Sequence, residues 1–297
     1  MNFKTWKCSI CNSQKIGKVK KYLAKSDLFS SRQLIQCSTC GCKNIFPMIT
    51  DKELAEYNKD YWGDVQSDNN TSRKLYYFLA ESRANYLVNV LGNLDSFDIL
   101  DVGSGQGYLI DVLKEKFPSI NAYAVEIDSK MHKILNDKCE MVFSSWKEIT
   151  NMKFDVIILS HILEHMTDPI EFALGLKSML KKNGHFFIDI PNSDDLHVTH
   201  LESHLFVFNE KSLKRFIHEI DLTIVDFSTL GQKLRKLKPS IFYRINKKIL
   251  PKKIFQKYKV LRNRILIWFR RNKSLLDIHK LHKTGKNRAF FRVILKQ

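Results

Sequence analysis

Short apolar runs alternate with amphipathic stretches between residues 97 and 232. The apolar runs predict strands at residues 97–103, 121–128, 139–145, 154–160, 185–192 and 222–230. Helices are expected between them at residues 108–117, 129–137, 168–184 and 209–220, with Gly184 ending the third and Asn209 as the N-cap of the last. Because runs such as FDVIILS are mostly apolar, this alternation predicts an α/β fold with a parallel sheet covered on both faces.

The rest of the chain divides around this core. Residues 1–49 contain a cysteine-rich ribbon, residues 50–95 read as a helical lead-in and lid, and AFFRVILKQ at residues 289–297 predicts a final strand. Residues 233–288 separate that strand from the preceding one. We therefore expect four regions: 1–49, 50–95, a core made of 96–232 with 289–297, and an insertion at 233–288.

Five of the six cysteines lie in the first 42 residues. They include two CxxC pairs, Cys8 with Cys11 and Cys37 with Cys40, separated by 25 residues. In a reducing compartment this arrangement predicts one structural zinc ion, because each pair presents two thiolates to a tetrahedral metal. Cys42 is an alternative fourth ligand, although the regular spacing favours Cys40. Structural zinc sites are closed to water, so the chemistry is expected elsewhere.

Positive charge is concentrated in the insertion. The formal net charge of the chain is +18, and residues 233–288 hold 20 Lys and Arg against one acidic residue. A stripe of apolar side chains with cations on the opposite face is typical of an interfacial helix on anionic lipid, and it consists of Ile254, Tyr258, Leu261, Ile265 and Trp268. RNA binding and packing against the protein's own core are the alternatives. No uncharged apolar run reaches the ~18 residues of a membrane span, and the N-terminus lacks the apolar core of a secretory signal. We expect a cytoplasmic protein, peripheral at the inner membrane face.

A glycine-rich loop follows the strand expected at residues 97–103. In DVGSGQG, Gly103, Gly105 and Gly107 let the backbone turn sharply and approach a ligand at the positive end of the next helix. The third glycine comes one position too early for the dinucleotide fingerprint, which argues against a nicotinamide cofactor. Glu126 ends the next strand, where a carboxylate can accept hydrogen bonds from both hydroxyls of a ribose.

These segments together resemble class I S-adenosylmethionine-dependent methyltransferases. The resemblance rests on DVGSGQG, VEID, LSHILEHMTDP, LKKNGHFFIDIPN and AFFRVILKQ, and it covers about residues 72–232 with 289–297. It implies a Rossmann-like sheet of seven strands whose last strand is antiparallel and lies beside the sixth. The ribbon followed by YNKDYW resembles a subgroup with N-terminal zinc modules, which includes sugar C-methyltransferases and methyltransferases of surface-glycan clusters.

The resemblance also implies positions for S-adenosylmethionine. The loop residues Asp101, Gly103, Gly105 and Gly107 would hold its amino-acid part, and Glu126 its ribose. The remaining positions are Ile127 against the adenine, Ser145 and Trp146 at the adenine edge, and Ser160 beneath the reactive methyl group.

Methyl transfer from a sulfonium is an in-line displacement, so the protein must position the nucleophile and, for a hydroxyl or acidic C–H, remove a proton. HILEH places His161, Glu164 and His165 on one helical turn, and His204 lies in the loop after the fifth strand of the core. Resemblance to the sugar enzymes favours Glu164 and His165 as a working pair. The alternatives are histidines that only brace the helix, or a divalent metal, since two histidines and a carboxylate can bind one. Quinone-pathway O-methyltransferases, in which this cluster is linked to metal, carry a glutamate where His161 stands.

The sequence therefore predicts a methyltransferase that acts on a sugar or on a lipid-linked or surface glycan. An RNA methyltransferase that grips RNA with the ribbon and the basic segment is the nearest alternative enzyme. A non-catalytic binding protein with a vestigial cofactor fold is the alternative from another class. The sequence indicates neither the acceptor nor the oligomeric state.

Overall fold

The computed structural model describes residues 3, 5–24, 26–58, 70–196, 201, 203–233 and 288–297. Apart from its two end residues, the basic segment lies outside this part of the chain, and so does the stripe from Ile254 to Trp268. The expectations for the insertion therefore stay predictions.

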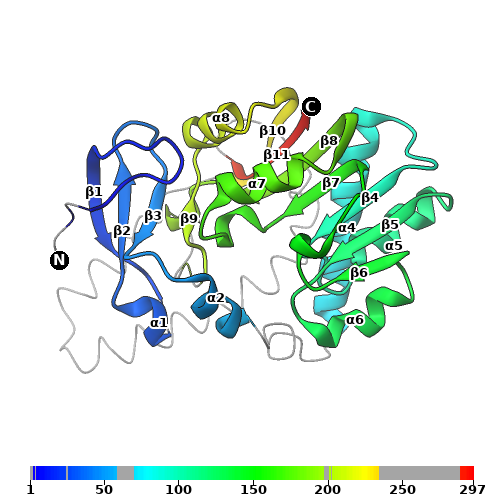
Figure 1. Cartoon of the computed structure of the whole chain (residues 1–297), viewed down its shortest axis with the longest axis horizontal. Helices are drawn as coiled ribbons and strands as arrows, with labels where there is room; N and C mark the ends of the chain where they lie inside the picture. The colour runs from blue at the N-terminus through cyan, green and yellow to red at the C-terminus, as the bar shows by residue number, and fades with distance from the viewer. Residues whose placement is uncertain are drawn as a thin grey trace, which may run out of the picture.

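Seven strands form one mixed sheet in the order β10-β11-β8-β7-β4-β5-β6, on the right of Figure 1. The strands β4 to β8 pair in parallel, and β11 is antiparallel to both of its neighbours, β8 and β10. Their bounds are β4 (Asp98–Val102), β5 (Asn121–Val125), β6 (Met141–Phe143), β7 (Phe154–Ser160), β8 (Leu180–Pro191), β10 (Thr223–Lys233) and β11 (Arg288–Lys296). This topology confirms the predicted seven-stranded fold with its last strand inserted beside the sixth.

Helices cover both faces of the sheet, because successive residues of each buried strand point to opposite sides. On one face Ile99, Val156 and Ile158 pack with α4 (Asn70–Leu91) and α5 (Tyr108–Lys116). On the other face Leu100, Ile157 and their neighbours pack with α7 (Pro169–Lys177) and α8 (Glu210–Glu219), while α6 (Ser129–Asn136) packs beside α5 and β5. The side chain of Asn209 caps α8, as predicted.

Two local predictions were wrong. The helix expected at residues 168–184 ends at Lys177, and β8 begins only three residues later. Leu180 pairs with Phe154 of β7, and Gly184 lies so close to backbone oxygens that an added Cβ would be 2.9 Å from two of them. Because the chain lies this close to β7, it pairs with β7 as a strand from Leu180 on, where the sequence pattern predicted that the helix would continue. Cys139, expected in a strand, lies half-buried before β6.

The N-terminal ribbon is a sheet of four strands in the order β1-β2-β3-β9. Three strands come from the ribbon itself, and β9 comes from the loop after β8; α1 and α2 complete the region. The bounds are β1 (Ile16–Lys21), α1 (Asp27–Ser30), β2 (Gln33–Cys37), β3 (Lys43–Phe46), α2 (Asp51–Asn58) and β9 (Phe206–Val207). Figure 1 shows β9 between the ribbon and the large sheet. One continuous hydrophobic core joins Trp6 and Phe29 of the ribbon to Phe208 and Phe216.

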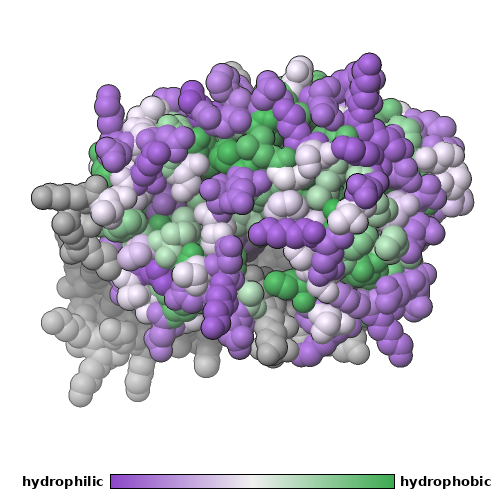
Figure 2. Space-filling model, in the orientation of Figure 1, coloured by the Kyte–Doolittle hydropathy of each residue, from purple (hydrophilic) through white to green (hydrophobic). Residues whose placement is uncertain are grey.

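One face of the molecule can be judged for polarity from Figure 2. On the face seen in Figure 2, hydrophilic side chains dominate and apolar side chains form small separate patches. Among the described helices, none combines the length and apolarity needed to cross a membrane.

Candidate active site

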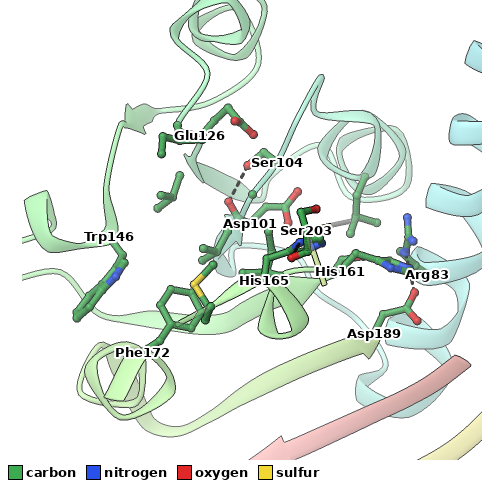
Figure 3. A pocket seen from close by; sticks show the side chains of 18 of the residues that line it. Arg83, Asp101, Ser104, Glu126, Trp146, His161, His165, Phe172, Asp189 and Ser203 are labelled. Carbon is green, nitrogen blue, oxygen red and sulfur yellow. Dashed lines mark hydrogen bonds and ion pairs between the residues drawn. The ribbon is translucent and has the colours of Figure 1, made fainter. Parts of the chain in front are cut away.

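A cavity of about 620 Å³ opens at the carboxyl ends of β4, β5 and β7. Ligands of open α/β sheets bind at this edge, because the loops that follow parallel strands converge there. The lining includes Asp101 after the middle of β4, Glu126 directly after β5, and Ser160 at the end of β7. Figure 3 shows Glu126 and Trp146 at one end of the cavity and Arg83 and Asp189 at the other.

The glycine-rich loop wraps around the end of β4. Gly103 and Gly107 have φ values of +74° and +73°, which L side chains rarely adopt, and a Cβ on Gly103 would lie 2.0 Å from the side chain of Ile162. Gly103 lines the cavity, whereas Gly105 and Gly107 lie outside its lining. Gly107 is instead the N-cap of α5, so these two glycines shape the loop.

Glu126 fixes this loop from the neighbouring strand. Its Oε2 accepts a hydrogen bond of 2.8 Å from the Gly105 amide, and its Oε1 accepts one of 2.9 Å from the Asp128 amide. The side chain is nearly fully buried, and this burial raises the pKa of Glu126. The carboxylate therefore has a role within the protein besides the ligand contact inferred from sequence.

Asp101 is a buried carboxylate at the floor of the cavity. Burial raises the pKa of Asp101 to about 7, although the nearby charge of Arg83 acts in the opposite direction. No side chain or backbone donor among the described residues hydrogen-bonds to its carboxylate. The Asp101 carboxyl group thus faces the cavity without a hydrogen-bond donor among the described residues.

The remaining cofactor candidates line the same end. Ile127, Ser145, Trp146 and Ser160 all border the cavity. Trp146 packs edge-on against Phe172 of α7, with ring centroids 6.0 Å apart. A Cβ on Gly175 would lie 2.4 Å from the indole, so this glycine makes room for the tryptophan. Ile127 remains half exposed, at 51%.

Three histidines converge on the opposite part of the cavity. His161, His165 and His204 line it, while Glu164 lies behind them and is 1% exposed. His161 has φ +56° and is followed by a 3₁₀ turn, η2 (Leu163–His165), where sequence predicted one helical turn. The rings of His165 and His204 meet edge-to-face with centroids 4.8 Å apart. The four predicted catalytic side chains therefore lie together.

Their protonation follows from their partners. Burial opposes ionisation of Glu164, but His161 Nδ1 at 3.2 Å from its Oε1 and the neighbouring imidazoles lower the pKa of Glu164 to about 2. Burial lowers the pKa of His165 to about 4. Burial also disfavours the cation of His204, but the hydrogen bond to Asp194 and the charges of Glu164 and Asp194 together outweigh burial and raise the pKa of His204.

One nitrogen each of His165 and His204 and one oxygen of Glu164 lie within 4.8 Å of one another, which is close enough for the three atoms to bind one metal ion. Sequence reasoning placed His161 in this group, and the structure brings His204 there from the loop after β8. The carboxylate of Glu164 faces His161 at 3.2 Å, yet neither of its buried oxygens has a hydrogen-bond partner among the described residues, so the group retains free acceptors for a proton or a metal ion.

Sequence reasoning missed a buried ionic cluster beside the histidines. Asp189 lies 2.7 Å from Arg83 and 3.2 Å from Arg292, and all three line the cavity. Asp189 of β8 and Arg292 of β11 are directly opposite each other in the sheet. The sequence could have predicted this cluster, because Asp189 and Arg292 each lie inside an apolar strand and a buried charge requires a partner.

The ribbon brings its four predicted metal ligands together. Sγ atoms of Cys8 and Cys40 are 3.6 Å apart, as are those of Cys11 and Cys37. Tetrahedral zinc with Zn–S of about 2.3 Å sets the sulfur atoms roughly 3.8 Å apart, so the cluster fits a zinc ion. Cys42 is buried outside this cluster, with its Sγ 3.8 Å from the carbonyl oxygens of Lys43 and Val207.

Comparison with known proteins identifies relatives of the large sheet. Residues 68–226, a little more than half of the chain, match the family described as "Methyltransferase domain". The ubiquinone biosynthesis O-methyltransferase of Photobacterium profundum is 28% identical over 123 residues, which is 37% of this chain and 50% of that protein. The enzyme of the same name from Haemophilus ducreyi is 26% identical over 160 residues, 48% of this chain and 65% of that protein. The chain thus spans half to two thirds of the length of these relatives.

A solved structure covers more of the chain. The 1,6-didemethyltoxoflavin-N1-methyltransferase of Burkholderia thailandensis, crystallised with 1,6-didemethyltoxoflavin and S-adenosylhomocysteine, has 14% identity and a TM-score of 0.49. The similarity covers 90% of this chain and 96% of that chain.

Proposed function

We propose, since the chain belongs to the class I S-adenosylmethionine-dependent methyltransferases, that it transfers a methyl group to a hydroxyl of a sugar or glycan acceptor. The observation that carries this proposal is the cavity with two chemically different ends. An acidic end contains Asp101 and Glu126, and a basic end contains three histidines.

The acidic end suits the cofactor. Asp101 is a buried carboxylate without a donor among the described residues, and the ammonium group of S-adenosylmethionine would supply one. Each oxygen of Glu126 accepts one backbone hydrogen bond and retains a lone pair for a ribose hydroxyl. Arg83 lines the cavity beyond Asp101, where its charge acts to lower the pKa of Asp101 and would also attract a carboxylate of the cofactor. The bound cofactor supplies an electrophilic methyl group on a sulfonium.

The basic end suits an acceptor that must lose a proton. A hydroxyl becomes a competent nucleophile as its proton is removed, and a positioned imidazole is the usual base near neutral pH. The curated relatives are O-methyltransferases by name, which supports oxygen as the nucleophile. The choice of a sugar over other hydroxyl compounds rests on the ribbon, which resembles that of the sugar-modifying subgroup.

The two remaining regions have supporting roles in this proposal. The ribbon binds one structural zinc through Cys8, Cys11, Cys37 and Cys40, because the four sulfur atoms are already arranged for it. The basic segment holds the enzyme at an anionic membrane surface, where a lipid-linked acceptor would be presented.

The test is incubation with methyl-labelled S-adenosylmethionine and three acceptor sets: nucleotide sugars with lipid-linked glycans, dihydroxybenzoates, and total RNA. Mass spectrometry of the products should find a gain of one methyl group on a sugar hydroxyl. Methylation of RNA alone would replace the glycan proposal with the RNA alternative. Binding of the cofactor without transfer to any set would favour the non-catalytic binding protein.

A further inference from the structure

The described part of the loop that carries His204 has little regular structure of its own and is held from both sides. Within its described part, residues 201 and 203–208, only the two residues of β9 are in a strand. Ser203 is buried with φ +66°, a conformation that a non-glycine residue keeps only where its surroundings impose it. The position of the His204 ring therefore depends on the contacts of this loop.

The core provides the first set of contacts. His204 Nδ1 lies 2.5 Å from Asp194 Oδ2, in the 3₁₀ turn η3 (Asp194–Leu196) that follows β8. Asp194 is 3% exposed, so its carboxylate is directed at the imidazole and shielded from water. The Leu205 amide donates a 2.7 Å hydrogen bond to the carbonyl of Glu164, and the Ser203 carbonyl lies 2.9 Å from His165 Nδ1.

The ribbon provides the second set. The hydroxyl of Tyr22, just after β1, donates a 2.9 Å hydrogen bond to the carbonyl oxygen of His204 itself. On either side of that carbonyl, the Leu201 amide donates to the Leu23 carbonyl at 2.7 Å, and the Ile45 amide donates to the Leu205 carbonyl at 3.0 Å. The ribbon thus fixes the backbone of His204, while Asp194 fixes its ring.

We propose that His204 is the general base of methyl transfer, and that Asp194 and the ribbon residue Tyr22 are the positioning residues that hold it there. This inference rests on the proposed transfer to a hydroxyl. In this arrangement the N-terminal ribbon helps to hold an active-site residue in position.

The hydrogen bond to Asp194 determines which nitrogen reacts. A carboxylate can only accept, so Nδ1 carries the hydrogen and Nε2 keeps the lone pair. The acceptor hydroxyl gives its proton to Nε2 while its oxygen forms a bond to the methyl carbon. The carbon–sulfur bond breaks and its electron pair stays on sulfur, leaving S-adenosylhomocysteine and an imidazolium paired with Asp194.

The groups around His204 make it a better general base than the neighbouring His165. The charged and titratable groups that face its ring are Asp194 from η3, with Glu164 and His165 from η2. Both carboxylates stabilise a proton on His204, whereas burial keeps His165 neutral down to a pKa of about 4. A base that holds its proton so weakly contributes little driving force near neutral pH.

Two pairs of variants separate positioning from general damage. Asp194→Asn is matched by Asp195→Asn, since Asp195 is in the same turn but pairs with Lys43 of the ribbon. Tyr22→Phe is matched by Tyr77→Phe, which removes a tyrosine hydrogen bond to Glu115 outside the cavity.

With the acceptor found in the screen, His204→Gln should lower kcat about 100-fold or more. In the pH profile of kcat, Asp194→Asn should lower the maximum value and move the rise on the acidic side to lower pH. Tyr22→Phe should lower kcat about 5-fold without moving this rise.

Nuclear magnetic resonance of histidine labelled with ¹⁵N, with S-adenosylhomocysteine bound, tests the arrangement without turnover. We expect His204 with hydrogen on Nδ1, and a lower pKa of His204 in Asp194→Asn but not in Asp195→Asn. An unchanged titration, or equal loss of kcat in both aspartate variants, overturns the proposal. Loss of activity on chelation with recovery on adding Mg²⁺ would instead make the cluster a metal site. Failure of all acceptors would refute the proposed function, while the resonance experiment would still decide the arrangement of His204.

Discussion

Asp101→Asn should remove a pH dependence of cofactor binding that the wild-type cavity imposes. The pKa of Asp101 is raised by burial from 3.8 to about 7. At about 1.4 kcal/mol per unit, the unliganded protein destabilises the charged carboxylate by roughly 4 kcal/mol. The folded protein binds this proton more tightly than the unfolded chain does. Stability without ligand should therefore fall as pH rises from about 4 to about 7.

Binding of the cofactor's ammonium group requires the ionised form of Asp101. With a pKa near 7, about one molecule in eleven is ionised at pH 6 and about three in four at pH 7.5. Apparent affinity for S-adenosylhomocysteine should accordingly rise about 8-fold over this interval, since it scales with the competent fraction. Asp101→Asn should bind more weakly and show a flatter profile.

Calorimetric titration with S-adenosylhomocysteine in two buffers of different ionisation enthalpy measures both affinity and proton release. The matched control is Asp98→Asn, because Asp98 lies on the same strand, pairs with Lys181 and is outside the cavity. Wild-type affinity that is constant between pH 6 and 7.5 would refute this reasoning. So would a profile that survives Asp101→Asn unchanged.

Three further predictions follow from the other sites. Glu126→Ala should lower both the midpoint of thermal unfolding and the affinity for S-adenosylhomocysteine, because it removes two backbone hydrogen bonds to a carboxylate, each about 1.5–3 kcal/mol; a loss of affinity alone would assign the side chain to the ligand only. Metal analysis of protein purified under reducing conditions should find one zinc per chain, and Cys37→Ser should lose both the metal and solubility, because metal-binding energy is folding energy here; zinc-free protein that is fully folded would contradict this. Wild-type protein should co-sediment with anionic liposomes, less so in high salt, and Trp268→Glu should weaken this binding while leaving salt-sensitive RNA binding largely intact; retention of RNA without liposome binding would favour the RNA alternative.

Local patterns were sufficient to predict the strands of the large sheet, whereas the place of its antiparallel last strand came from the family resemblance. Apolar runs such as Phe154–Ser160 are buried on both faces, and turn signals separate them, so strand order along the chain could be inferred from sequence. The helix at residues 168–184 was misjudged because its end depends on a contact outside its own pattern. Leu180 pairs with Phe154, 26 residues earlier, and this pairing replaces the last expected helical turn with strand.

Most of the residues expected to bind the cofactor line one cavity, because they directly follow neighbouring strands, and their binding of the cofactor stays a prediction. The cluster of Arg83, Asp189 and Arg292 was not predicted, although its charged residues in apolar strands were visible. Which strands lie side by side is a property of the sheet, and Asp189 meets Arg292 only because β11 is inserted next to β8.

The contacts around His204 could not be predicted from local sequence patterns. Tyr22 and His204 are 182 positions apart, and each is an ordinary residue in its own segment. A hydroxyl that donates to a backbone carbonyl has no sequence signature at the acceptor. The pairing of β3 with β9 and the hydrogen bond from Leu201 to Leu23 bring the two segments together, and the pairing adds a piece of the core to the ribbon's sheet. The ribbon, whose cysteines predicted a structural zinc site with the chemistry elsewhere, therefore holds the loop of a candidate base. Loss of the metal should consequently disturb His204 before it unfolds the seven-stranded sheet.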